Sequence, residues 1–383
     1  MATSISEYTT WAGLPESILD DIVRDRDTAE SQGSVTQGVV DGLVSAGVFR
    51  LFTPREYGGY ECAPRPVLEL TRTLAGLDSS AAWLMMASCN SALLAARMDP
   101  TGAQEVFADP SAVVAGSLHR GGTAVPVDGG FRFSGTWRLA SGAARASWLI
   151  CSAVVEEWDD KRPWVFMIEQ REARISPAEP LIGLRGSGTD SFSVTDCFVP
   201  HRRAIAPDAA TRIRRPLYLS PMANFINPPL AAVALGIADR ALDAFRRTSA
   251  SRRLRGSDDP TCRSALVQDL FGRALGLRDS GAAYLFTVVD RAWEEALSGP
   301  RLSDQTTSDL FLATATTMHN CVEAVRLLYD FGGAQAIVES SELGRCFRDI
   351  HTANHHDAAS EAIFGRVGDF ALNGRGTRTR TAG

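Results

Sequence analysis

The hydrophobic period of this 383-residue chain changes twice, and these changes constrain the fold more than any other feature. Apolar residues recur at helical spacing up to about Asp109. From Ala112 to about Arg215 the period becomes two, which is typical of strands, and helical spacing then returns. The pattern predicts an α+β fold. Its expected parts are an N-terminal helical domain (1–111), a central antiparallel β domain (112–215), a C-terminal helical bundle (216–373) and a flexible tail (374–383).

The β region centres on GGFRFSGTWRLASGAARASW, from Gly129 to Trp148. Its first residues follow Asp128 and predict a tight hairpin turn, because glycine readily adopts positive φ angles. A strand-like alternation follows, with one face made of Phe131, Phe133, Gly135, Trp137 and Leu139. The strand then gives way to ASGAARAS, a small and polar stretch that lets another group approach the main chain closely. A flat ligand and a packed neighbouring strand both satisfy this pattern.

Charge and motif content exclude several classes of function. The net charge of −6 argues against nucleic-acid binding, and no apolar run is long enough to cross a membrane. Seven cysteines without a CxxC pair indicate neither a disulfide framework nor a zinc site, so we expect a cytoplasmic protein. His351 and His355 share a helix face with Arg348, and a cation there disfavours a metal. The chain contains no GxGxxG dinucleotide fingerprint, no GxxxxGK phosphate loop and no GxSxG nucleophile motif.

Three stretches carry a resemblance to a known family. EYGGYECAP follows the N-terminal helical region, GLRGSGTDSFSVTDCFVP closes the β region, and LLYDFGGAQAI lies late in the bundle. Together they resemble the acyl-CoA dehydrogenase superfamily of flavoproteins over essentially the whole chain. The resemblance implies a flavin between the β domain and the bundle, and a homotetramer in which the Gly-Gly-Ala-Gln stretch reaches a neighbour's flavin.

The C-terminal region indicates which branch of the superfamily the chain resembles. It lacks the Tyr-Glu-Gly segment that often carries the dehydrogenase base and reads ELGRCFRDIHTANHHDAASEAIF instead. An Arg-Asp pair followed about seven residues later by histidine is similar to the flavin-dependent monooxygenases of the superfamily. The similarity implies a two-component system, in which a separate NAD(P)H-dependent reductase supplies FADH2 or FMNH2. Dioxygen then forms a flavin hydroperoxide that hydroxylates an aromatic or polycyclic small molecule.

The same resemblance implies the residues that contact the flavin. Ser141 matches a family position whose hydroxyl, with nearby backbone N–H groups, protects the oxygenated flavin; the alternative is a serine that only caps a turn. An arginine meets the flavin phosphate in the family, and either Arg252 or Arg253 matches it. The complete set of predicted cofactor contacts is Trp137, Ala140, Ser141, Gly142, Arg253, Gly332, Gly333 and Gln335.

A histidine is the expected base, because the pKa of imidazole lies close to neutral pH. In a regular helix His356 shares a face with Asp349, whereas His355 lies on the side of His351, so His356 is the first choice and His355 the second. The predicted substrate contacts are Trp83, Asn90 and His119. Asn90 departs from S-oxygenase relatives that carry histidine in this region, which weakens the expectation of a thiophene substrate.

Three other functions remain open at this stage. An amino-sugar N-oxygenase is a close variant, since no motif identifies the substrate. An acyl-CoA dehydrogenase would carry tightly bound FAD and be reduced directly by an acyl-CoA. A flavin-fold protein without a redox task would bind no flavin.

Overall fold

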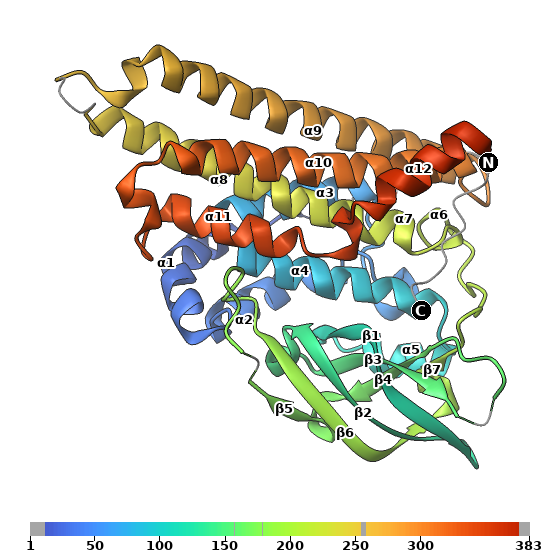
Figure 1. Ribbon diagram of the computed structural model, residues 1–383. Helices are drawn as coiled ribbons and strands as arrows, with labels where there is room; N and C mark the ends of the chain where they lie inside the picture. Colours follow the sequence, from blue (N-terminus) through green and yellow to red (C-terminus); the bar gives the residue numbers. More distant parts are fainter. Residues whose placement is uncertain (1–11, 157, 178, 254–257, 375–383) are drawn as a thin grey trace.

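The computed structural model describes residues 12–156, 158–177, 179–253 and 258–374, so most of the predicted tail lies outside the described residues. A helical bundle packs over a seven-stranded sheet (Figure 1), which confirms the predicted α+β fold. Within these ranges, no helix combines the length and the apolar character that a membrane span requires.

The N-terminal region is helical because its apolar residues repeat at helical spacing and its helices start at favourable residues. α3 and α5 both begin with proline, which suits the first helical position because its missing N–H has no helical partner there. Asp78 separates α3 from α4 and caps α4 by accepting the Ser80 N–H at 3.1 Å. The helices are α1 (Glu16–Gln32), α2 (Gln37–Ser45), α3 (Pro64–Leu77), α4 (Ser79–Ala92) and α5 (Pro100–Phe107).

The sheet has the strand order β5-β6-β2-β1-β3-β4-β7. Its strands are β1 (Val114–Val127), β2 (Gly130–Ser141), β3 (Trp148–Val155), β4 (Trp164–Glu169), β5 (Arg174–Ser176), β6 (Thr189–Pro200) and β7 (Ala204–Ile205). The expectation of a wholly antiparallel sheet was wrong, because β1 and β3 pair in parallel from Val114 opposite Trp148. The short connection after β2 crosses to the other side of β1, so β3 runs in the direction of β1.

The predicted hairpin is present, but its alternation ends early. Val127 pairs with Gly130, and Gly129 has a φ of +77° at the turn. A register shift between Trp137 and Ala140 interrupts the pairing of β2 with β6. Leu139 therefore has a φ of +56° and is 56% exposed, although alternation had placed it on the same face as Phe133 and Trp137, which are buried. The bulge ends the regular strand pattern just before Ser141.

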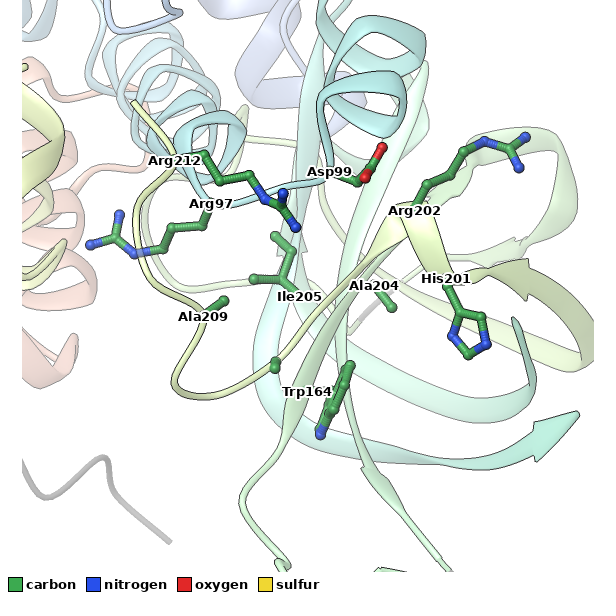
Figure 2. A pocket seen from close by; sticks show the side chains of 10 residues that line it. Arg97, Asp99, Trp164, His201, Arg202, Ala204, Ile205, Ala209 and Arg212 are labelled. Atoms are coloured by element: carbon green, nitrogen blue, oxygen red, sulfur yellow. The ribbon is translucent and has the colours of Figure 1, made fainter. Parts of the chain in front are cut away.

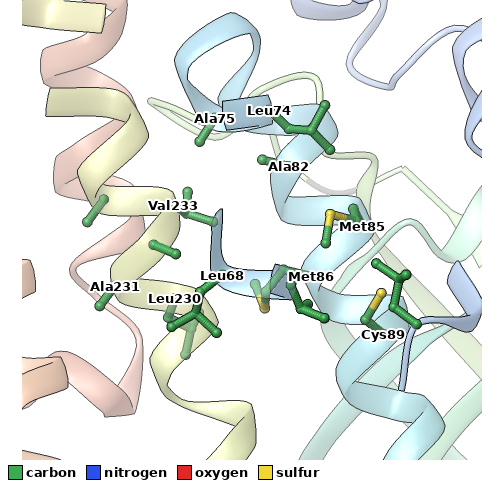
Figure 3. Close-up of a cluster of buried hydrophobic side chains, with 14 of the residues drawn as sticks. Leu68, Leu74, Ala75, Ala82, Met85, Met86, Cys89, Leu230, Ala231 and Val233 are labelled. Atoms are coloured by element: carbon green, nitrogen blue, oxygen red, sulfur yellow. The ribbon is translucent and has the colours of Figure 1, made fainter. Parts of the chain in front are cut away.

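The C-terminal helices are α6 (Pro216–Leu219), α7 (Ala223–Ile226), α8 (Pro228–Ser251), α9 (Ala265–Ser298), α10 (Asp304–Asp330), α11 (Glu342–Ala353) and α12 (Ala362–Asn373). Helix α4 lies between the long helices and the sheet (Figure 1). Its apolar side chains join those of α3 and α8 in one buried cluster (Figure 3) that includes Leu68, Leu74, Met85, Cys89, Leu230 and Val233. Burial of these side chains removes apolar surface from water and holds α4 against the bundle.

Buried Asp349 joins three segments that are distant in the sequence. Its carboxylate accepts the Leu184 N–H at 2.6 Å and the Ser79 hydroxyl proton. Gly183 permits this approach, since a Cβ atom there would lie 2.2 Å from the carbonyl oxygen of Arg348. The GLRGSG loop before β6 is therefore fastened to α11 and to the start of α4.

Asp78 is a second buried carboxylate at the same junction. It makes no ion pair among the described residues, and burial raises its pKa from 3.8 to about 6, although the Ser80 N–H and the charge of Arg240 oppose the shift. Because the folded-state pKa is raised, protonated Asp78 stabilises the fold at low pH. This contribution is lost as the pH rises through about 6.

We expect Asp78→Asn to remove this pH dependence, because asparagine retains an acceptor for the helix cap but carries no buried charge. Between about pH 5 and pH 8, the wild-type protein should lose roughly 1 to 2 kcal/mol of unfolding free energy that the variant keeps. Denaturant unfolding at both pH values measures the difference. Parallel pH profiles for the two proteins would contradict the assignment.

Candidate functional site

A hydrogen-bonded row of side chains crosses from α4 to the sheet. The indole Nε1 of Trp83 donates to the Ser141 Oγ at 3.0 Å. The Ser141 Oγ lies 2.7 Å from the Thr189 Oγ1, which lies 2.7 Å from the Ser187 Oγ. Trp83, Ser141 and Thr189 are all half-buried. The row joins the middle of α4, the end of β2 and the start of β6.

The hydroxyl group of Ser141 is oriented by the hydrogen-bond donors and acceptors around it. An indole nitrogen only donates, so the Ser141 oxygen accepts from Trp83. If the Ser141 hydroxyl donates to Thr189, its oxygen keeps a second lone pair for a ligand; if Thr189 donates instead, the Ser141 proton is available to a ligand. Ser141 can therefore hold a polar ring atom without carrying a charge.

His356 lies at the other side of Trp83. The two rings meet edge to face, with centroids 6.2 Å apart and an interplanar angle of 71°. The assumption of a regular helix through His356 was wrong, because α11 ends at Ala353 and His356 begins the 3-10 turn Asp357–Ala359. The Ala358 N–H donates to the His356 Nδ1 at 3.2 Å.

His356 is an exposed residue, although protein atoms surround its ring closely enough to desolvate it in part. This partial burial lowers its pKa from 6.5, as does the nearby charge of His119, while Asp357 raises it. His356 is therefore neutral near pH 7. His119, an exposed residue of β1, is thus one of the groups that influence the pKa of His356.

His355 makes no described contact with Trp83 or with the His356 ring. It is exposed, and its charge acts on His351, whose ring packs against Phe347 with centroids 4.3 Å apart. The charge of His355 therefore acts on His351, and among the described residues no ring contact joins His355 to Trp83.

Two of the predicted cofactor contacts on β2 are enclosed by protein. Trp137 is 1% exposed and stacks between Phe133 and Phe192, with centroids 5.0 and 5.1 Å away. The side chain of Ala140 is also fully buried. Trp137 therefore packs the interior of the sheet, and its ring offers no free face to a ligand.

The backbone N–H of Gly142 also makes its hydrogen bonds within the protein. Its N–H lies 3.0 Å from the Ser187 carbonyl oxygen and 2.9 Å from that of Gly188. This hydrogen bonding uses the backbone donor that the sequence assigned to the flavin. Gly142 instead closes the turn after Ser141, with a φ of +77° that favours glycine.

The remaining predicted cofactor residues form a second group at the turn after α10. Gly333 and Gln335 are exposed, whereas Gly332 is buried. Arg252 donates to the carbonyl oxygen of Phe331 at 2.7 Å. The exposed Arg253 pairs with Pro260 in an isolated antiparallel β-bridge. Among the described residues, no hydrogen bond or ring contact connects this group with Ser141.

Asn90 lies two helical turns beyond Trp83 on α4. Its Nδ2 donates to the Ile226 carbonyl oxygen at 2.9 Å and approaches the Met86 Sδ at 3.2 Å. Its buried Oδ1 has no hydrogen-bond partner in the described part of the chain. Asn90 is therefore anchored on one side and keeps an unused acceptor on the other.

A cavity of about 420 Å³ lies elsewhere, between the start of α5, the strands β4 and β7 and the loop after β7 (Figure 2). Its lining includes Trp164, His201 and Arg212. None of the residues predicted for the site lines this cavity. It is a separate feature of the molecule.

Sequence reasoning missed three contributors to the site. Thr189 and Ser187 extend the hydroxyl row, and the backbone N–H of Ala358 binds His356. The Ser-Gly-Thr of GLRGSGTD could have indicated Ser187 and Thr189, since hydroxyl groups at the start of one strand commonly contact the end of a neighbouring strand. No sequence pattern indicated the Ala358 contact, which depends on where α11 ends.

Comparisons with known proteins agree on one family. The family described as "Acyl-CoA dehydrogenase, C-terminal domain" matches residues 229–361. Indole-3-acetate monooxygenase of Pseudomonas putida is 27% identical over 92% of each chain. "Flavin-dependent monooxygenase, oxygenase subunit HsaA" of Mycobacterium tuberculosis is 26% identical over 88% of each chain.

Solved structures show the same fold. XiaF from a Streptomyces species, in complex with FADH2 and glycerol, superimposes with a TM-score of 0.85. The match covers 96% of this chain and 95% of that chain, at 22% sequence identity. With the curated relatives, this likeness confirms the resemblance inferred from the sequence motifs. The chain is thus similar to the acyl-CoA dehydrogenase superfamily and, within it, to the branch of flavin-dependent monooxygenases.

Proposed function

We propose that this protein is the oxygenase component of a two-component flavin-dependent monooxygenase that hydroxylates an aromatic or polycyclic small molecule. The observation that carries the proposal is the arrangement of Ser141, Trp83 and His356, in which one indole contacts both a hydroxyl and an imidazole. The relatives named as flavin-dependent monooxygenases support the same class of reaction.

The residues around Ser141 fit a flavin ring. Leu139 is 56% exposed two residues before Ser141, and Leu118 is 48% exposed next to His119. Such apolar groups can cover a flat ring, while the Ser141 hydroxyl meets a polar atom at its edge. The strained φ of Leu139 supports a functional role for this bulge, because strain of this kind is concentrated at ligand sites.

A bound reduced flavin supplies the chemistry that activates dioxygen and transfers one of its oxygen atoms to an organic substrate. In this proposal Ser141 holds the ring, and Trp83 fixes the orientation of that hydroxyl. Trp83 and the neighbouring apolar side chains exclude water from the reacting atoms. His356 contacts the polar group of the substrate, and His119 and Asn90 line the substrate side.

The oxygenase-subunit name of one relative implies a separate reductase for such systems. We extend the proposal to an NAD(P)H-dependent flavin reductase partner, a homotetramer and a cytoplasmic location. The exposed turn with Gly333 and Gln335, with the adjacent Arg252 and Arg253, is proposed to contact a flavin in a neighbouring subunit. In the described part of the chain, no hydrogen bond or ring contact joins this turn to the Ser141 group, which supports two separate roles for these surfaces.

The proposal is tested by mixing the purified protein with chemically reduced FAD or FMN, labelled dioxygen and a panel that includes indole-3-acetate. We expect a product that carries one labelled oxygen atom, identified by mass spectrometry. Direct flavin reduction by an acyl-CoA, without oxygen incorporation, would favour a dehydrogenase instead. Failure to bind either flavin in a titration would exclude both enzymes.

Ser141→Ala should increase the hydrogen peroxide released per reduced flavin consumed and lower the product yield. The variant removes the hydroxyl that we place at the flavin, and loss of one such donor typically costs about 100-fold or more in the assisted step. Quantifying peroxide and product in the same reaction measures this coupling. Ser45→Ala, at the exposed end of α2, is the matched control. An unchanged ratio in Ser141→Ala would remove Ser141 from the site.

His356→Ala should lower product formation by about 100-fold or more, while the affinity for reduced flavin changes far less. His355→Ala is the neighbouring control and should retain activity, because the charge of His355 acts on His351 and no described ring contact joins His355 to Trp83. Anaerobic flavin titration and product analysis separate the two effects. Equal losses in both variants would show that the turn, and not His356, is responsible.

A further inference from the structure

The contact between Ala358 and His356 determines which ring nitrogen of His356 is available. The backbone N–H of Ala358 can only donate, so the His356 Nδ1, at 3.2 Å, must accept. A neutral imidazole carries one proton, which therefore resides on Nε2. This nitrogen makes no hydrogen bond within the described part of the chain, so its N–H is free for a ligand.

From this geometry we infer that His356 acts as a hydrogen-bond donor through its Nε2–H and not as the base that the sequence suggested. The inference rests on the proposed function and specifies its substrate more closely. A donor at this position recognises an oxygen acceptor. The expected substrate is an aromatic molecule that presents an ionised phenol or another oxygen with a free lone pair.

The base role conflicts with the local structure for a simple reason. To take a proton at Nε2, the neutral ring must first carry its proton on Nδ1. That proton would face the N–H of Ala358, and two donors would then oppose each other. The same conflict arises in a doubly protonated imidazolium. The Ala358 N–H thus favours the neutral ring with the proton on Nε2.

The 3-10 turn is held firmly enough to impose this preference. Ala358 and Ala359 are each 3% exposed, and the Ala359 N–H donates to the His356 carbonyl oxygen at 2.9 Å. The Ala359 carbonyl oxygen in turn lies 2.8 Å from the His319 Nε2 on α10. Trp83 packs against the His356 ring. A change of ring orientation would therefore disturb contacts on two sides.

Nuclear magnetic resonance of the full-length protein, labelled with ¹⁵N-histidine, tests the inference without any substrate. Spectra of the wild-type protein and of His356→Gln at about pH 8, with and without reduced flavin, identify the His356 signals by difference. We expect an unprotonated Nδ1 and a protonated Nε2. The opposite assignment would overturn the inference. Because no turnover is needed, this result is independent of whether the proposed function is correct.

A pair of variants supplies the functional test on the panel compound that the wild-type protein oxygenates. Glutamine can place an amide donor near the position of Nε2, but it cannot accept a proton at neutral pH. His356→Gln should therefore keep product formation within about 10-fold of the wild-type protein, whereas His356→Ala should lose about 100-fold or more. If the glutamine variant is as impaired as the alanine variant, the donor role is wrong and the base role is restored.

Discussion

The buried carboxylate of Asp349 is the interaction on which the geometry of the site depends. It binds the Leu184 N–H of the GLRGSG loop and the Ser79 hydroxyl at the start of α4. Helix α11 leads to His356, the GLRGSG loop leads to Thr189, and α4 carries Trp83. A buried carboxylate requires hydrogen-bond partners, because its desolvation is costly without them. The need to satisfy one group thus brings α11, the loop and α4 into a single relative position.

Trp83 then connects the two sides of the site. Its nitrogen binds the hydroxyl of Ser141, and its ring meets the edge of His356. The hydroxyl row is uncharged, and partial desolvation lowers the pKa of His356, which favours its neutral form. A site of this kind can orient polar atoms and exclude water without placing a fixed charge beside a reactive oxygen species, as a monooxygenase requires.

Much of the fold could be predicted because it follows from local patterns. Helical spacing predicted the C-terminal bundle, to which α8, α9 and α10 belong, and the glycine pair at Gly129 predicted the hairpin. The parallel pairing of β1 with β3 escaped prediction, because it depends on which side of β1 the chain crosses. The exposure of Leu139 was not predicted either, because a β-bulge shifts the alternation of side chains by one residue. Trp137 was assigned to the flavin, but an aromatic residue on a strand packs a core equally well.

The sequence alone was enough to predict the α+β fold and the likeness to the superfamily, because hydrophobic period and a few glycine-rich motifs are properties of local segments. Sequence reasoning also preferred His356 to His355. It assumed a regular helix through both residues, whereas α11 ends at Ala353. The role of His356 depends on contacts that the folded chain makes around its ring. The protonation of its ring depends on the N–H of Ala358 and on packing against Trp83. Such a contact arises where α11 ends against another part of the chain, and no pattern within the segment encodes it.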